Sequence, residues 1–194
     1  MKIWKYASDS DENYQKYIDH QISTTHKKNS WVYLSPITIE HIFYYKGFAV
    51  QNILCHGTRA AGEQKYFQNR YPNAYIIGSE ICDTAEDYPM TIRHDFNKPK
   101  TEWLGKFDVV YSNSLDHSIT PRETLNVWKN QLNNTGTLFL EYSQSRSVHH
   151  PNDPLDASEN DIINLIKDAN MDIKAEFRDG VQARGVIWAC EVMK

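Results

Sequence analysis

The chain of 194 residues has few cysteines and no Cys-x-x-Cys pair. Cys55, Cys82 and Cys190 are odd in number, so they cannot all pair with one another, and each lies in or beside an apolar, strand-like run. These features favour small buried side chains over a disulfide framework or a redox function. A zinc site of the usual spacing is disfavoured as well, and we predict no metal ion.

Long apolar runs and a strong excess of one charge are also absent. No apolar run approaches the roughly 20 residues of a membrane-spanning helix, and residues 1–5 lack the core of a signal peptide. We therefore predict a cytoplasmic protein with no membrane partner. The formal net charge is −4, which gives no global field to attract a polynucleotide, so nucleic acid is a disfavoured partner.

The most informative stretch is residues 53–63, Ile-Leu-Cys-His-Gly-Thr-Arg-Ala-Ala-Gly-Glu. An apolar strand breaks at Gly57 and continues into a helix, and the next apolar strand, residues 75–79, ends at Glu80. A strand, a small-residue turn, a helix and a second strand that ends on an acid form a βαβ unit suited to a nucleoside. The turn and the helix N-terminus approach the backbone of the ligand, and the acid accepts hydrogen bonds from the ribose.

Three later segments continue this alternation. Residues 91–96 read Thr-Ile-Arg-His-Asp-Phe, residues 106–117 read Lys-Phe-Asp-Val-Val-Tyr-Ser-Asn-Ser-Leu-Asp-His, and residues 128–141 contain a helix end, an Asn-Asn-Thr-Gly turn and an apolar strand. Together with the glycine turn and Glu80, these segments resemble, in order and spacing, the motifs of the class I S-adenosylmethionine-dependent methyltransferases. The resemblance covers roughly residues 50–142.

The resemblance implies an α/β fold with a Rossmann-like, seven-stranded methyltransferase sheet. That sheet is mostly parallel with an antiparallel C-terminal strand, and helices cover both faces. We expect an N-terminal helical cap segment at residues 1–48 and a methyltransferase-like domain at residues 49–194, within one compact domain overall. The hairpin-like ending, with strands at 171–177 and 185–193, favours this sheet over a dinucleotide domain, whose strands continue in parallel.

The resemblance further implies S-adenosyl-L-methionine as the cofactor. The residues expected to bind it are Cys55, His56, Gly57, Thr58, Arg59, Gly62, Glu80, Ile81, Asp95, Phe96, Asn113 and Ser114. The sequence departs from the family pattern at Cys55, which replaces an acid, and at Ala60 and Ala61, which replace glycines and limit how closely the backbone approaches a ligand. Arg59 is interpreted either as a partner of the cofactor's carboxylate or as a surface ion pair.

In such enzymes the methyl group is already activated by the cofactor. The protein therefore positions the two reactants and, for a hydroxyl or amine acceptor, removes a proton. Asp116 and His117, at the end of the fourth strand, are the catalytic candidates, with His117 as a general base near neutral pH and Asp116 beside it. The alternative that His117 only caps the loop or helix beneath it stays open.

The acceptor is predicted to be a small molecule. The Asn/Asp-Pro-Pro-aromatic tetrapeptide of the enzymes that methylate amino groups of nucleic acids is absent at residues 112–115. The acceptor is expected between the N-terminal helices and the polar stretch at 143–157. In that stretch His149, His150 and Asp153 are interpreted as a solvated loop rather than a metal site. The aromatic residues at 31, 33 and 43–45 either line the acceptor pocket or pack. The oligomeric state is left open.

Two rival functions stay open. A nicotinamide-dependent oxidoreductase requires Gly-x-Gly-x-x-Gly, and residues 57–62 match only its first and last positions. The second rival is a non-catalytic domain that binds S-adenosylmethionine or another nucleoside and acts as a regulator or partner subunit. The departures at Cys55, Ala60 and Ala61 favour this interpretation.

Local signals set the remaining helices. Residues 10–20 read as a helix opened by acids, residues 37–45 as an apolar segment, and residues 63–70 as the first crossover helix. Thr120-Pro121-Arg122-Glu123 reads as a capping box for a helix at about 121–132, and Ser158 reads as the cap of a helix at 159–169.

Overall fold

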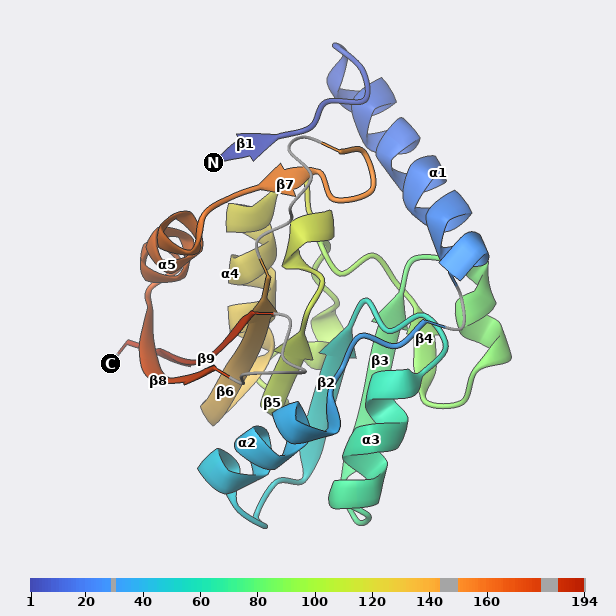
Figure 1. Ribbon diagram of the computed structural model, residues 1–194. Coiled ribbons are helices and arrows are strands. Elements are labelled where there is room, and N and C mark those ends of the chain that lie inside the picture. The colour runs from blue at the N-terminus through green and yellow to red at the C-terminus, as the bar shows by residue number, and fades with distance from the viewer. Residues whose placement is uncertain (29–30, 144–149, 179–184, 194) are drawn as a thin grey trace.

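The computed structural model describes residues 1–28, 31–143, 150–178 and 185–193. Its centre is a seven-stranded sheet in the order β4-β3-β2-β5-β6-β9-β8 (Figure 1). The strands are β2 (Asn52–His56), β3 (Tyr75–Glu80), β4 (Thr91–Arg93), β5 (Phe107–Ser112), β6 (Leu132–Tyr142), β8 (Met171–Arg178) and β9 (Val186–Val192). The pairs from β4 to β6 are parallel, whereas β9 is antiparallel to both β6 and β8.

This topology confirms the predicted sheet. Strand β9 lies between β6 and β8, where Leu140 pairs with Trp188 and Ala175 pairs with Ala189. The two C-terminal strands are adjacent in the sequence, and a short connection can join only antiparallel neighbours. The hairpin-like ending therefore determines the one antiparallel strand that the described sheet contains.

Helices cover both faces of the sheet (Figure 1). The described α-helices are α1 (Ser10–Lys28), α2 (Pro36–Lys46), α3 (Gly62–Arg70), α4 (Pro121–Gln131) and α5 (Glu159–Asp168). Leu54 joins a core with Trp128 of α4 and Ile166 of α5, whereas its neighbour Ile53 joins a second core with Phe67 of α3. Adjacent residues of a strand point to opposite faces, so α4 and α5 cover one face and α2 and α3 cover the other.

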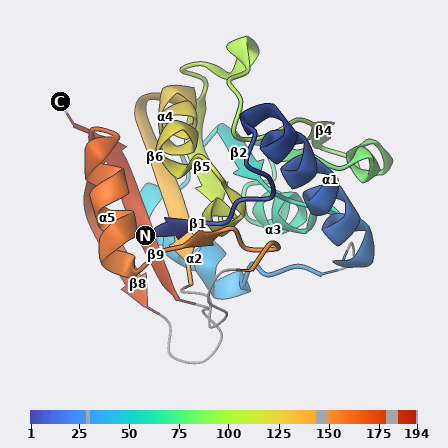
Figure 2. The same cartoon turned by 90° about the horizontal axis from the view of Figure 1, so that it is seen from above.

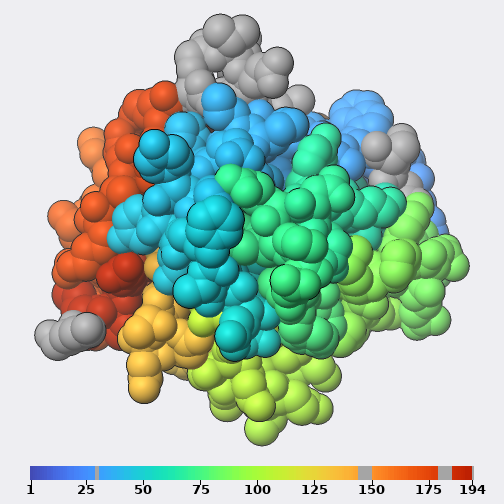
Figure 3. Space-filling view, turned by 90° about the horizontal axis from the view of Figure 1, so that it is seen from below, coloured from blue at the N-terminus to red at the C-terminus, as the bar shows by residue number. Residues whose placement is uncertain are grey.

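Helices α2 and α3 lie side by side on the surface seen in Figure 3. The Arg70 Nε atom is 3.1 Å from a Glu40 carboxylate oxygen, and the Arg70 guanidinium lies over the Phe43 ring. The segment predicted at 37–45 is helix α2, which the Ser35 side chain caps by accepting from the Ile37 backbone amide. These contacts hold α2 and α3 on one face of the sheet. Neither of these two helices covers the carboxyl ends of the strands.

The N-terminal segment covers that carboxyl edge. Strand β1 (Lys2–Ile3) pairs antiparallel with β7 (Leu155–Asp156), and both lie between α1 and α5 in the view from above (Figure 2). The prediction that the first helix ends at residue 20 was wrong, because α1 continues to Lys28. Thr24 and Thr25 are weak helix formers in the sequence, but they are buried against the rest of the molecule, and such burial overrides local propensity.

Other local predictions were partly wrong. The turn expected at 133–136 lies within the bounds of strand β6, where these four residues bulge out of the ladder, because Leu132 pairs with Phe107 and the next pair is Thr137 with Val109. Thr120 makes no side-chain cap at α4, although proline does occupy the first turn. At α5 the box is complete, because the Asp161 amide donates to Ser158 Oγ over 3.2 Å and the Ser158 amide donates to Asp161 Oδ2 over 2.9 Å.

None of the helices within the described ranges combines the length and the apolar character that crossing a membrane requires.

The two caps give a matched test of stability. Ser158→Ala removes a side chain that caps α5, so we expect the free energy of unfolding to fall by about 1 kcal/mol. Thr120→Ala removes an exposed side chain without a cap bond and serves as the control, with almost no change expected. Urea unfolding monitored by circular dichroism measures both variants, and equal losses would contradict the assignment of the caps.

Candidate active site

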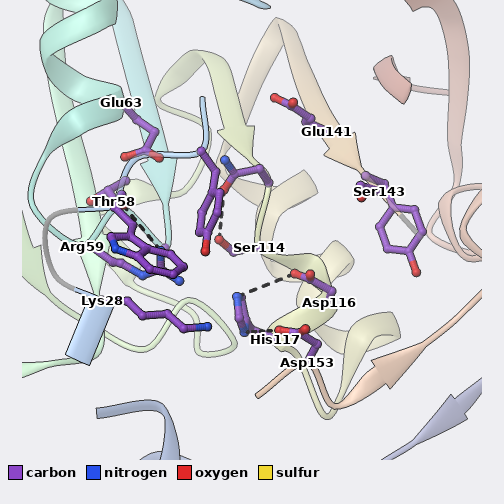
Figure 4. A pocket seen from close by; sticks show the side chains of 15 residues that line it. Lys28, Thr58, Arg59, Glu63, Ser114, Asp116, His117, Glu141, Ser143 and Asp153 are labelled. Atoms are coloured by element: carbon purple, nitrogen blue, oxygen red, sulfur yellow. Dashed lines mark hydrogen bonds and ion pairs between the residues drawn. The ribbon is translucent and has the colours of Figure 1, made fainter. Parts of the chain in front are cut away.

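Two adjoining cavities open at the carboxyl edge of the parallel strands. The first has a volume of about 240 Å³ and is lined by Lys28, Trp31, Tyr33, Gly57, Thr58, Arg59, Glu63, Asn113, Ser114, Asp116, His117, Glu141, Tyr142, Ser143 and Asp153 (Figure 4). The second has a volume of about 40 Å³ and is lined by Tyr17, Gln21, Thr24, Thr25, Gly57, Arg59, Glu80, Ile81, Asp95, Phe96, Ser114 and His117. The cavities share Gly57, Arg59, Ser114 and His117, so they form one continuous region.

The turn between β2 and α3 separates the two cavities from the core. Gly57 has φ of 73°, and a Cβ atom there would lie 2.5 Å from Ser114 Oγ, so only glycine fits. Arg59 and Ala61 also have positive φ values, 41° and 57°. The sharp turn results from these three residues, and it brings the backbone of β2 next to the end of β5.

The carboxylate of Glu80 is the best-anchored acid of the second cavity. It is 4% exposed and accepts from the Arg59 amide over 2.9 Å and from the Cys82 amide over 3.0 Å. Thr25 Oγ1 of α1 lies 3.4 Å from Glu80 Oε1, the oxygen that also accepts from the Cys82 amide. Glu80 therefore joins the turn after β2, the end of β3 and helix α1 at one point.

Asp95 forms the other polar end of the second cavity. It accepts from the Asn97 amide over 2.9 Å and from the Asn97 side chain over 2.8 Å, and Tyr14 of α1 donates to it as well. Phe96, the next residue, lies in the wall of the same cavity. Helix α1 thus covers both Glu80 and Asp95 in this structure.

His117 lies in the 3₁₀ turn η3 (Leu115–His117), which follows β5. Its Nδ1 atom is 2.7 Å from the carbonyl oxygen of Asn152, which can only accept. The proton of the neutral imidazole is therefore on Nδ1, and Nε2 is the basic nitrogen. Asn152 also contacts α1, because its Oδ1 atom is 2.7 Å from His20 Nε2, so the ring is oriented by a segment far away in the sequence.

Asp116 and Asp153 flank the His117 ring (Figure 4). Asp116 Oδ1 is 3.9 Å from His117 Nε2, and Asp153 Oδ1 is 3.7 Å from His117 Nδ1. The Asp116 side chain is 24% exposed overall, but its Oδ1 atom is buried and has no hydrogen-bond partner among the described residues. Burial raises the pKa of Asp116, and the neighbouring His117 partly opposes that rise.

Two further carboxyl groups line the first cavity from the sheet side. Glu63, in the first turn of α3, is 5% exposed, and burial raises its pKa to about 7 from the ordinary 4.5. Glu141, at the end of β6, accepts from the Tyr111 hydroxyl over 2.7 Å. Both acids lie on the wall opposite Asp153 (Figure 4).

Most of the residues predicted to form the site lie in these cavities. Cys55, His56 and Gly62 do not: all three are buried and line neither cavity. Burial lowers the pKa of His56 to about 3, and its neutral ring lies between Ser79 and Gln131 at 2.7 and 2.8 Å. Gly62 lies against Val32, whose side chain leaves no room for a Cβ atom. In this structure these three positions pack in the protein interior, and none of them borders a cavity.

Sequence reasoning missed several lining residues. Glu63 carried a signal, because it is an acid directly after the glycine turn, where a helix N-terminus meets a ligand. Asp153 was interpreted as part of a solvated loop, yet it lies beside His117. Asn152 and the α1 residues Gln21, Thr24 and Thr25 gave no local signal, since only the packing of α1 on the carboxyl edge brings them to the site. Of the pair His149 and His150, the first lies outside the described residues.

Three ligand atoms from Asp116, His117 and Asp153 lie within 4.8 Å of one another, as do those from His26, Cys82 and Asp83. At His117 the Nδ1 proton is bonded to the Asn152 carbonyl, so this nitrogen has no lone pair for a metal ion.

No protein-family model matches the chain, and no curated protein matches its sequence. Solved structures do match. The 1,6-didemethyltoxoflavin-N1-methyltransferase of Burkholderia thailandensis, with bound 1,6-didemethyltoxoflavin and S-adenosylhomocysteine, aligns at a TM-score of 0.76 and 12% identity over 99% of this chain and 94% of that one. The magnesium protoporphyrin IX methyltransferase of Synechocystis with bound S-adenosylmethionine aligns at 0.63 and 13% over 97% and 99%.

An S-adenosylmethionine-dependent methyltransferase from Clostridium acetobutylicum aligns at a TM-score of 0.64 and 10% identity over 96% of this chain and all of that one. At such identities the similarity concerns the fold. The chain has the Rossmann-like fold of the class I methyltransferases, and it has that fold over nearly its whole length.

The buried carboxyl of Glu63 predicts a pH-dependent stability. Its pKa is about 7 in the folded chain and ordinarily 4.5, so the folded state keeps this proton to a higher pH. The stability due to the neutral group is present below about pH 4.5 and is lost as the pH rises through about 7. We expect Glu63→Gln, which cannot ionise, to gain about 2–4 kcal/mol over the wild type between the lower and the upper end of this window.

Urea unfolding of the ligand-free protein at both ends of the window measures this gain. The matched control is Glu123→Gln, which changes an exposed acid of α4 and should show the same difference from the wild type at both pH values. A Glu63→Gln variant whose difference from the wild type does not change with pH would show that Glu63 ionises normally.

Proposed function

We propose that this chain is an S-adenosylmethionine-dependent methyltransferase that acts on a small-molecule acceptor. The observation that supports this function most directly is the junction of the two cavities. One contains a buried, anchored acid, and the other contains a histidine with two flanking carboxyl groups, and they meet at Gly57, Ser114 and His117. When bound, the cofactor supplies a methyl group activated by a sulfonium, and transfer requires an acceptor atom in line with the departing sulfur.

The second cavity suits the nucleoside end of the cofactor in its chemistry. Glu80 offers carboxylate oxygens to ribose hydroxyls at the end of β3, where an open α/β sheet binds nucleosides. Ile81 and Phe96 offer apolar surface to a base, and Asp95 offers an acceptor for the exocyclic amino group of adenine. The sequence motifs propose the same four residues for the cofactor.

The first cavity suits the amino-acid end. Asn113 Nδ2 is buried and has no hydrogen-bond partner among the described residues, so it is a donor for a ligand oxygen. Arg59 and Lys28 provide positive charge for a carboxylate in the same cavity. Glu63 can replace the acid that is missing at Cys55. Burial, and after it the charge of Glu63, raises the pKa of the Cys55 thiol, so Glu63 lies near Cys55, and Glu63 also lines the cavity.

The volume of the second cavity requires a movement. At about 40 Å³ it is too small for adenosine, because Tyr14 and Thr25 of α1 contact Asp95 and Glu80. Entry of the nucleoside requires α1 to shift outward and to exchange these contacts for contacts with the ligand. A covering segment that opens for ligand entry is common in enzymes.

His117 is proposed as the residue that removes a proton from the acceptor. The Asn152 carbonyl keeps the Nδ1 proton in place, so Nε2, which lies 3.9 Å from Asp116 Oδ1, is the base. Two carboxyl groups within 4 Å of the ring stabilise the imidazolium that results.

A non-catalytic domain that binds S-adenosylmethionine is the second candidate. It is favoured by the departures from the family pattern at Cys55, Ala60 and Ala61, of which Cys55 and Ala61 are fully buried and line neither cavity. Calorimetry with S-adenosylmethionine, S-adenosylhomocysteine and NAD tests binding. Release of S-adenosylhomocysteine from pooled metabolites then separates an enzyme from a binding domain.

Glu80 provides the test of the cofactor site. Glu80→Ala should weaken the binding of S-adenosylmethionine by about 1.5–3 kcal/mol, because charge-assisted hydrogen bonds to the ribose are lost. Asp95→Ala should weaken it less, and NAD should not compete. Calorimetry measures these affinities, with Glu86→Ala, an exposed acid of the neighbouring 3₁₀ turn η1 (Asp83–Asp87), as the control. Unchanged affinity in a folded Glu80→Ala protein would remove Glu80 from the site.

His117 provides the test of proton transfer. His117→Asn should lower turnover by about 10²-fold or more and abolish the rise of activity with pH, while the affinity for the cofactor stays nearly the same. Turnover and calorimetry on the same preparation measure both quantities. If binding and turnover fall together by the same factor, His117 supports the cavity and is not a base.

A further inference from the structure

The acceptor end of the first cavity presents two hydrogen-bond acceptors to one point. The Asn152 carbonyl holds the proton of His117 on Nδ1, which leaves Nε2 as an acceptor. Asp116 Oδ1 lies 3.9 Å from Nε2, and a carboxylate oxygen is an acceptor too. Neither atom donates to the other in this protonation state, so a ligand that fits between them has to donate to both.

The described part of the protein supplies no hydrogen-bond donor to Asp116 Oδ1. Oδ1 is buried and has no hydrogen-bond partner in the described part of the chain. A buried, unsatisfied carboxylate oxygen costs free energy, which a suitable ligand recovers on binding. Burial also raises the pKa of Asp116, and a cation bound beside it would lower that pKa and favour the carboxylate.

The number of hydrogens decides which ligand group fits. A hydroxyl has one hydrogen, so it can satisfy His117 Nε2 or Asp116 Oδ1 but not both. A primary amine or its ammonium form has at least two, and it satisfies both acceptors at once. The site is therefore matched to a nitrogen that carries several hydrogens.

The charge of the surroundings favours the cationic form. Four carboxyl groups line the first cavity, those of Glu63, Asp116, Glu141 and Asp153, and although burial raises the pKa of Glu63 to about 7, the other three outnumber the two basic side chains. Both basic groups lie over aromatic rings of the adjoining segment: Lys28 Nζ is 5.5 Å from the Trp31 ring centre, and Arg59 is 5.0 Å from that of Tyr33. No basic side chain of the described residues forms an ion pair with Asp116 or Asp153, apart from His117.

We propose that the methyl acceptor is a small primary amine, bound as its ammonium between Asp116 and His117. This proposal rests on the methyl-transfer function proposed above. The size limit follows from the cavity of about 240 Å³, which also has to hold the amino-acid end of the cofactor. Asp116 binds and orients the ammonium, and His117 acts on its proton.

The step balances as follows. His117 Nε2 takes one proton from the ammonium, which frees the nitrogen lone pair. The nitrogen then forms a bond to the methyl carbon while the bond from that carbon to sulfur breaks, and the sulfur keeps the electron pair. The product is a secondary ammonium, and the Asp116 carboxylate stabilises its positive charge. The imidazolium returns its proton to solvent when the product leaves.

Matched amines and alcohols test the assignment. Benzylamine and benzyl alcohol differ only in the group that reaches Asp116 and His117, and calorimetry measures the binding of each, with and without saturating S-adenosylhomocysteine. We expect the amine to bind at least about tenfold more tightly, because the alcohol leaves one acceptor unpaired. Tyramine carries an amine and a phenol, and mass spectrometry of its product with S-adenosylmethionine should show methylation on nitrogen.

The variants Asp116→Asn and Asp172→Asn form a matched pair. Each removes one carboxylate, but Asp172 is on β8 and pairs with Lys174, away from the cavity. We expect Asp116→Asn to lower the ratio of amine to alcohol affinity at least about tenfold, and Asp172→Asn to leave it unchanged. A merely structural role of Asp116 would weaken both ligands together and keep the ratio.

The outcomes separate this proposal from the function on which it rests. Four outcomes would each overturn the amine assignment: equal affinity for amine and alcohol, no amine binding at millimolar concentration, O-methyltyramine as the product, or an unchanged ratio in Asp116→Asn. If O-methyltyramine is the product, the proposed methyl transfer still stands. Failure of S-adenosylmethionine to bind would overturn the proposed function. The amine preference of the cofactor-free protein would still be decided by the same calorimetry.

Discussion

The buried carboxylate of Glu80 is the constraint on which the rest of the site depends. It receives the amides of Arg59 and Cys82 and lies against Thr25, so it ties the turn after β2, the end of β3 and helix α1 together. A carboxylate that is 4% exposed is tolerated only when such donors surround it. Those donors fix the backbone at the point where the two cavities meet.

The site combines a rigid part with a part assembled from distant segments. The sheet and the β2–α3 turn are rigid, because positive φ values and close packing at Gly57 leave few alternatives. The His117 ring, by contrast, is oriented by Asn152, and Asn152 is held by α1 through His20. Under the proposed function, a displacement of α1 that admits a nucleoside would also reach His117 through His20 and Asn152.

Burial sets the chemistry of the first cavity as much as residue identity does. Glu63 and Asp116 are ordinary acids in the sequence, but desolvation raises both pKa values, because the charged forms lose water without gaining a full set of donors. Arg59 and Lys28 provide charge of the opposite sign on the side of the cavity that includes Trp31 and Tyr33. The cavity thus offers both basic and acidic side chains to a ligand.

The sequence by itself determined the sheet and its antiparallel β9, because strand periodicity and turn chemistry act over a few residues. The same motifs proposed Gly57, Glu80, Asp95 and His117 as site residues. It also favoured buried cysteines, and all three are buried. Only the tertiary structure decided that α1 continues to Lys28, that Thr120 makes no cap, that His56 lies in the core, and that Asp153 and Asn152 meet His117. These outcomes depend on contacts between segments far apart in the chain, and local propensity carries no information about which segments will meet.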